Sequence, residues 1–184
     1  MTRILTAVNE DPLRLKVIRT AGEWARRLDA EVTVCHVLPK GRYERLRDEL
    51  RRQQQEHMVT MPQDIISDAY YEEVYRRWNL PERQFGEEEG HSLAHHVARD
   101  IASHLAEYGV EHESRGWVGE PARGIVGLAD EIEVDLIVIG FEGLHGLGRV
   151  AALGSVSREV LERATRQVLV VPTLHEDADA SRET

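Results

Sequence analysis

The chain has few of the residues that secreted, membrane-spanning or nucleic-acid-binding proteins use most. Cys35 is the only cysteine, so an internal disulfide is excluded and a reducing compartment is expected. Lys16 and Lys40 are the only lysines, which excludes a polybasic membrane-binding segment. No apolar run approaches the ~20 residues that span a bilayer, and residues 1–3 lead into a short strand pattern and not a signal sequence. We therefore expect a soluble, cytoplasmic protein with no membrane partner.

The charge balance is strongly acidic. The formal net charge is -10 and the sequence pI is about 5.4, whereas a protein that binds DNA or RNA needs a basic surface. Nucleic acid is therefore not an expected partner. A length of 184 residues is typical of one domain and is sufficient to bury a core.

The first part of the chain alternates between two hydrophobic periods. Residues 3–8 and 31–37 have the pattern of buried strands, and residues 12–28 between them have the pattern of a helix with Pro12 near its start. A strand, a helix and a second strand in this order predict a parallel pair joined by a right-handed crossover. The expected apolar stripe of the helix is Leu15, Ile18, Ala21, Ala25 and Leu28.

The alternation continues in the second half of the chain. A helix is predicted over residues 91–108, with Gly109 as its C-terminal cap and with a buried stripe. Less regular patterns predict two helices in the region between, over residues 43–57 and 64–78, with Pro62 and Pro81 as breaks. The buried stripe of the helix over 91–108 consists of Leu93, Val97, Ile101 and Leu105. The remaining predicted elements are strands over 110–118, 135–139 and 168–171, and helices from Pro121 to Ile132 and from Ser155 onward.

These elements predict an α/β fold. We expect a single three-layer domain over residues 1–174, with a five-stranded parallel sheet and helices on both faces. A helical insert over about 40–90 separates strands two and three, and the polar tail 175–184 is expected to be disordered. The insert could enlarge an interface, cover a ligand site or dock a protein partner, and the sequence does not choose among these roles.

A glycine-rich loop follows the strand over 135–139. Gly140, Gly143, Gly146 and Gly148 precede the pair Gly154 and Ser155, where the next helix begins. Glycines let backbone N–H groups approach an anion, and a helix start adds unpaired donors and the positive end of the helix dipole. The loop therefore predicts a phosphate site, with a ligand-free connection as the alternative. Arg149 and His145 lie in the same loop, as phosphate contacts or as solvated side chains.

Other chemistry is weakly indicated. His91, His95 and His96 cluster on a predicted helix, but no cysteine or carboxylate completes a metal-binding set, so a solvated helix face is favoured over a metal site. No nucleophile with a base and no pair of carboxylates flanks the glycine loop, so we expect no catalytic residues and favour a protein that is not an enzyme.

Several segments together resemble the universal stress protein family. The resemblance covers nearly the whole chain except residues 40–90. It implies the fold of the adenine-nucleotide alpha-hydrolase-like proteins, a homodimer, and members that either bind ATP or have lost that ability. The matching segments are residues 4–9, His36 and Val37, Val118 to Pro121, Asp135 to Gly143, Gly154 to Ser157, and Val168 to Pro172.

The resemblance also implies a nucleotide site at numbered positions of this chain. Adenosine is expected near Ala7, Asn9 and Val37, with Gly140 close by, and the phosphates near Gly143, Gly154, Ser155 and Val156. The expected cofactor is ATP, and whether magnesium accompanies it is left open.

Two positions depart from the ATP-binding pattern of the family. Ten residues, 144–153, separate Gly143 from Gly154, where the ATP-binding members have nine. Asn9 occupies the position where those members carry Asp, so one acceptor remains and the charge is lost.

Three functions follow from the sequence. The first is ATP binding in a stress-response or signalling dimer, and the alternative is a dimeric interaction protein of the same fold that binds no nucleotide. A weak ATPase is a distant third. The apolar strand over 168–171 is expected at a sheet edge, where pairing with a second copy would cover it, so a homodimer through Val168–Val171 is predicted.

Overall fold

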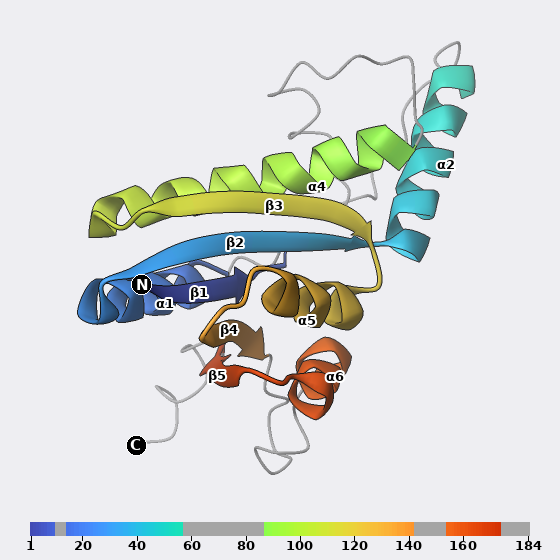
Figure 1. Cartoon of the computed structure of the whole chain (residues 1–184). Helices are drawn as coiled ribbons and strands as arrows, with labels where there is room; N and C mark the ends of the chain where they lie inside the picture. Colours follow the sequence, from blue (N-terminus) through green and yellow to red (C-terminus); the bar gives the residue numbers. More distant parts are fainter. Residues whose placement is uncertain (10–13, 57–86, 142–153, 174–184) are drawn as a thin grey trace, which may run out of the picture.

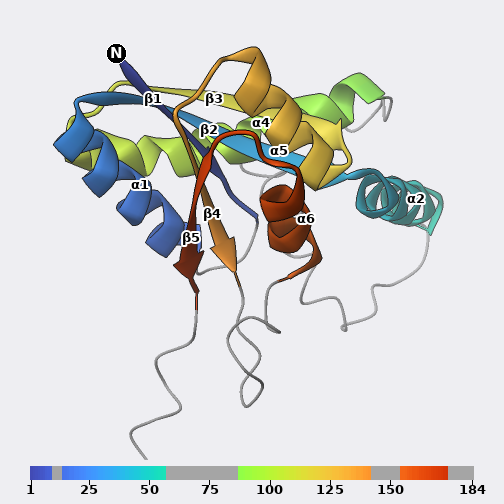
Figure 2. The same ribbon diagram turned by 60° about the horizontal axis from the view of Figure 1, so that its bottom comes forward.

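The computed structural model describes residues 1–9, 14–56, 87–141 and 154–173. Five parallel strands form one sheet, as the alternation of strand and helix patterns predicted, and their order in the sheet is β3-β2-β1-β4-β5. The strands are stacked in Figure 1, and the arrowheads of β4 and β5 lie at the same edge in Figure 2. The strand bounds are Thr2–Ala7 (β1), Ala30–Pro39 (β2), His112–Gly119 (β3), Leu136–Phe141 (β4) and Gln167–Pro172 (β5).

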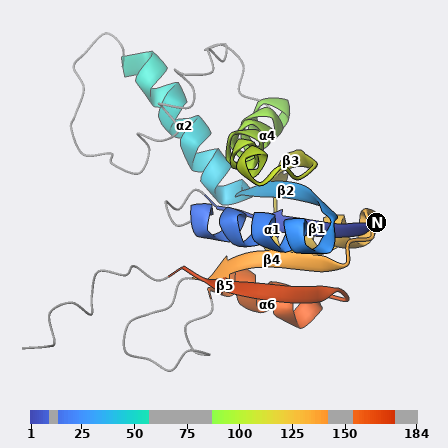
Figure 3. The same ribbon diagram turned by 90° about the vertical axis from the view of Figure 1, so that its left-hand side faces the viewer.

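Helices cover both faces of the sheet. Helices α1 and α4 pack on one face and α5 and α6 on the other, so that α1 lies in front of the sheet and α6 behind it in Figure 3. The three-layer prediction is confirmed. The helix bounds are Arg14–Leu28 (α1), Lys40–Glu56 (α2), Glu87–Ala102 (α4), Pro121–Glu131 (α5) and Ser155–Arg163 (α6), and a 3-10 helix η1 over Ser103–Tyr108 continues α4.

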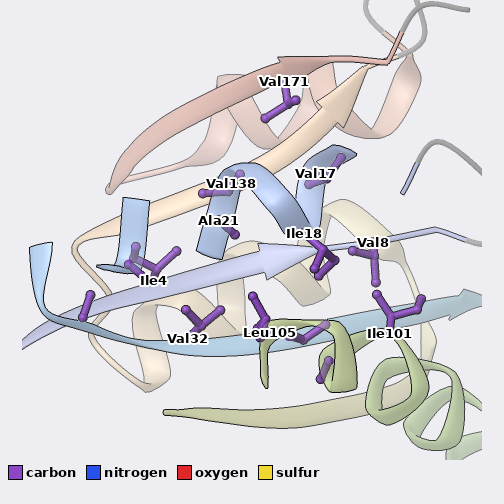
Figure 4. Packing of buried hydrophobic residues seen from close by; sticks show 14 of the residues in the cluster. Ile4, Val8, Val17, Ile18, Ala21, Val32, Ile101, Leu105, Val138 and Val171 are labelled. Carbon is purple, nitrogen blue, oxygen red and sulfur yellow. The ribbon is translucent and has the colours of Figure 1, made fainter. Parts of the chain in front are cut away.

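The larger core cluster lies between the sheet and the helices α1 and α4. Ile4 and Val32 from the strands meet Ile18 from α1 and Ile101 and Leu105 from α4 and η1, and all five are at most 1% exposed (Figure 4). The predicted stripe of the 91–108 helix is buried in full, although its last turn is 3-10. Gly109 ends it in the left-handed region at φ 65°, which confirms the predicted cap.

The predicted stripe of the first helix is partly wrong. Leu15 and Leu28 are 44% and 42% exposed, whereas Val17 is buried. Val17 lies directly beneath β4, because a Cβ built on Gly140 would be 2.9 Å from its Cγ2. The buried face of α1 is therefore rotated toward β4, and both leucines lie at its margins.

Helix α4 packs unusually closely on the edge strand β3. A Cβ added to Gly116 would lie 2.1 Å from the backbone carbon of Ala94 and from the backbone nitrogen of His95. Only a glycine allows this approach, because real Cβ atoms are not found so close to a backbone atom. The contact seats α4 on β3 along the edge of the sheet (Figure 1).

A third core cluster fixes the start of α2 at the end of β2. Tyr43 and Leu46, at 4% and 7% exposed, pack with Leu38 from β2 and Leu93 from α4. A Cβ built on Gly90 would lie 2.8 Å from Cε2 of the Tyr43 ring, so the ring packs directly against the first turn of α4. The predicted second half of the insert, including the helix expected over 64–78, and the predicted tail 175–184 lie outside the described residues.

Candidate functional site

A cleft opens at the carboxyl ends of the strands, where open α/β sheets bind their ligands. Its volume is about 280 Å³, close to the lower end of the range that is usual for small-molecule sites. The described lining comes from the ends of β1, β2, β4 and β5 and from the starts of α1, α2, α5 and α6. It consists of Ala7, Val8, Asn9, Val17, His36, Val37, Pro39, Arg42, Pro121, Ile125, Ile139, Gly140, Phe141, Gly154, Ser155, Val156, Ser157 and Thr173.

The end of β1 is held in place from β2. The backbone N–H of Val8 donates to the carbonyl of Cys35 at 3.0 Å, and Nδ1 of the buried His36 lies 3.0 Å from the carbonyl oxygen of Val8. Ala7 is paired with Cys35 on one side and with Ile139 of β4 on the other. These contacts fix the backbone just before Asn9, which therefore lies at the margin of the cleft.

The floor of the cleft is held by side-chain hydroxyls. Oγ of Ser157 donates to the carbonyl of Gly140 at 2.8 Å, which ties the first turn of α6 to the end of β4. Thr173 donates to the carbonyl of Phe141 through its backbone N–H at 2.9 Å and through Oγ1 at 2.7 Å. Both hydroxyls act as local donors to the strand end, so β4 is anchored where the chain leaves the sheet.

The first turn of α6 offers backbone donors to the cleft. Gly154 is its N-cap and makes no side-chain capping bond. The N–H of Arg158 donates to the carbonyl of Gly154 at 3.0 Å. The residues between, Ser155 to Ser157, all line the cleft. A helix start of this kind favours an anion, because its N–H groups lack intrahelical partners and lie at the positive end of the dipole.

Family membership follows from the whole-chain comparison. The family model described as the universal stress protein family matches residues 1–172. The chain belongs to this family. Universal stress proteins of Synechocystis and Bacillus subtilis are 39% identical over 84 residues and 40% identical over 75 residues, covering 46% and 41% of this chain. The chain spans about half the length of these curated relatives, 54% and 50%.

Solved structures of universal stress proteins share the fold. The Archaeoglobus fulgidus protein in complex with dAMP superposes with a TM-score of 0.51 at 26% identity, covering 92% of this chain and 97% of that one. A universal stress protein in complex with cAMP gives 0.53 at 22% identity, covering 94% and 97%. UspA from Lactobacillus plantarum gives 0.56 at 20% identity, covering 92% and 97%. Nucleotides are thus present in two structures of this fold.

The structure brings most of the predicted site residues of this universal stress protein into one cleft. Seven line it, whereas Gly143 lies outside the described residues together with Arg149 and His145. Contact of any of these residues with a ligand stays a prediction. The seven are Ala7, Asn9, Val37, Gly140, Gly154, Ser155 and Val156.

Sequence reasoning missed several lining residues. Pro39 and Arg42 were not expected, because the predicted helix of the insert began at residue 43, whereas α2 begins at Lys40 directly after β2. The available signal was position: a residue that follows the carboxyl end of a parallel strand lies at the ligand edge. Thr173 was also missed as a lining residue.

The histidines of α4 and the single cysteine lie outside the cleft lining. Among the described residues no group of three or more possible ligands could hold a metal ion. Desolvation, with the positive charge of Arg99 and the neighbouring His95, lowers the pKa of His96. Cys35 is fully buried, and burial raises its pKa to about 12, so the thiol is not a nucleophile in the folded protein. None of the described helices has the length and hydrophobicity of a membrane span.

Proposed function

We propose that this universal stress protein binds an adenine nucleotide, ATP, in the cleft and acts as a dimer in stress response or signalling. The main supporting observation is the juxtaposition of apolar strand ends with the uncapped start of α6. Val37 and Ile139 offer apolar surface for a base, Asn9 offers an amide, and Ser155 and Val156 offer N–H groups for phosphate. The solved relatives whose titles name dAMP and cAMP support a nucleotide as the ligand class.

The experiment is calorimetric titration of the purified protein with ATP, with and without magnesium. Saturable binding in the micromolar range supports the proposal, and ATP at a hundred times Kd should stabilise the folded state by about 2.7 kcal/mol. The test variant is Ser155→Glu, because a carboxylate at a helix start favours the helix but repels phosphate. Gln167→Glu is the matched control, since it makes the same change in charge at an exposed position outside the cleft lining.

Two results would contradict nucleotide binding. One is the absence of heat and of thermal stabilisation at millimolar ATP, and the other is equal affinity for ATP in wild type and Ser155→Glu. If binding is present, Asn9→Asp tests whether the lost charge weakens it, and a phosphate-release assay tests the weak ATPase alternative.

The second candidate is a dimeric interaction protein of the same fold without a nucleotide. The position of β5 favours dimerisation in either case, since β5 is an edge strand, as predicted, with partly exposed Val168, Leu169 and Val170. An exposed apolar edge favours pairing with another chain. Light scattering at micromolar concentration tests the dimer, and a mass of one 20.9 kDa chain would exclude it.

A further inference from the structure

The described lining of the cleft differs in charge from the chain as a whole. The formal net charge is -10, yet none of the described residues that line the cleft is Asp or Glu. Among those lining residues Arg42 is the one with a permanent positive charge, because a guanidinium stays protonated at any ordinary pH. The described wall of the cleft is therefore electrostatically suited to an anionic group.

The position of Arg42 is fixed by the core. The next residue, Tyr43, is buried against Leu38 and Leu93, and Leu46 one turn later is buried in the same cluster. The ring of Tyr43 packs against Gly90, where a side chain would collide with it. The first turn of α2 is thus anchored directly after the end of β2, as the ribbon shows (Figure 2), and Arg42 in this turn lines the cleft.

We propose that Arg42 makes the cleft selective for phosphorylated over unphosphorylated nucleosides by contacting a phosphate of the bound nucleotide. This inference rests on the proposed nucleotide site and deepens it. Arginine matches phosphate geometry with two parallel N–H donors, and such charge-assisted bonds are about twice as strong as neutral ones. The start of α6 offers backbone N–H donors to an anion, whereas Arg42, in the first turn of α2, adds the full charge of a guanidinium.

The test compares AMP with adenosine, which differ only in the phosphate. Wild-type protein and the variants Arg42→Gln and Arg45→Gln are titrated with both ligands. Arg45 is the matched control, because it is an exposed arginine of the same helix that is not part of the cleft lining. Arg42→Gln should weaken AMP binding by about 10-fold to 100-fold and change adenosine binding by less than about twofold. Arg45→Gln should change neither.

A salt titration gives a second readout. The affinity of wild type for AMP should fall as sodium chloride rises, and Arg42→Gln should flatten this dependence, because salt screens ion pairs. Circular dichroism and the melting temperature establish that each variant is folded.

The outcomes separate the two proposals. If wild type binds AMP and adenosine and Arg42→Gln lowers both affinities equally, or neither, the selectivity assigned to Arg42 is wrong while nucleotide binding stands. If wild type binds neither AMP nor ATP at millimolar concentration, both proposals are wrong. A loss confined to AMP in Arg42→Gln, with a flatter salt dependence, supports the inference.

Discussion

Replacing Gly116 by alanine tests the closest contact between a helix and the sheet. The added Cβ would lie 2.1 Å from backbone atoms of Ala94 and His95, whereas an ordinary contact begins near 3.4 Å. Helix α4 would have to retreat by more than about 1 Å, because a backbone cannot rotate away as a side chain can. Overpacking costs about 1–3 kcal/mol, and we expect the upper end at this position.

The loss of unfolded-state entropy offsets part of this cost. Alanine in place of glycine stabilises by about 0.4–1 kcal/mol where no strain arises, so the net destabilisation should be about 2 kcal/mol. For a chain of this size that corresponds to a melting temperature about 4–8 °C lower. Urea denaturation with a global fit of the midpoint and slope measures the same quantity at 25 °C.

Gly127→Ala is the matched control for this variant. Gly127 is exposed within α5, and a Cβ added to it meets nothing within 4 Å. Since glycine disfavours a helix interior, this variant should be more stable than wild type by about 0.5–1 kcal/mol. The two alanines are thus expected to act in opposite directions. A Gly116→Ala protein as stable as wild type would refute the close packing of α4 on β3.

Three further predictions concern single side chains. The Cys35 thiol has its pKa raised by burial to about 12 against 9.0 for an exposed thiol, so the unfolded state loses its proton first as pH rises. Stability should then fall above pH 9 with a slope approaching about 1.4 kcal/mol per pH unit, and Cys35→Ala, followed by urea denaturation at several pH values, should lack this component. The hydroxyl of Thr165 donates to Asp130 at 2.6 Å and is the main cause of the lowered pKa of that carboxyl, with Arg166 contributing less. Thr165→Val should raise this pKa in a carboxyl NMR titration, and an unchanged value would contradict the assignment. Ser157→Ala should cost about 1–2 kcal/mol in chemical denaturation, because the carbonyl it bonds lies at the anchored end of β4, and a loss below about 0.3 kcal/mol would show that water replaces the bond.

The order of strands and helices was predictable because local patterns determine it. The stripe from Leu93 to Leu105 repeats at helical spacing, and the strand over 135–139 is wholly apolar after its first residue, so each pattern fits one element type. The first helix shows the limit of this reasoning. Apolar residues lie on several sides of α1, and the pattern alone does not show that Val17 packs against Gly140 of β4 while Leu15 stays exposed.

Part of the cleft lining was predictable from the sequence. The resemblance to the family implied Ala7, Val37 and Ser155, and chain position agrees with it, because Ala7 and Val37 belong to strands that end at the ligand edge and Ser155 begins a helix. The position of Arg42 depends on where α2 begins, and Lys40 and Gly41 give no strong capping signal for that start. The sequence also offered no signal for Gly116. The requirement for glycine there comes from the close packing of α4 on β3, which no local pattern around Gly116 indicates.

The contact between Tyr43 and Gly90 also bears on how this protein could change during evolution. The chain leaves the end of β2 through α2 and returns through α4, and this contact holds the departing and returning segments together. The stretch of sequence between Leu46, the last α2 residue in the third core cluster, and Gly90 therefore begins and ends at one fixed junction. Closing a longer loop costs only about 0.6 kcal/mol per doubling of its length, so sequence could be gained or lost between these two residues with little strain on the sheet. The junction lets one segment diverge freely while the cleft beside it keeps its shape.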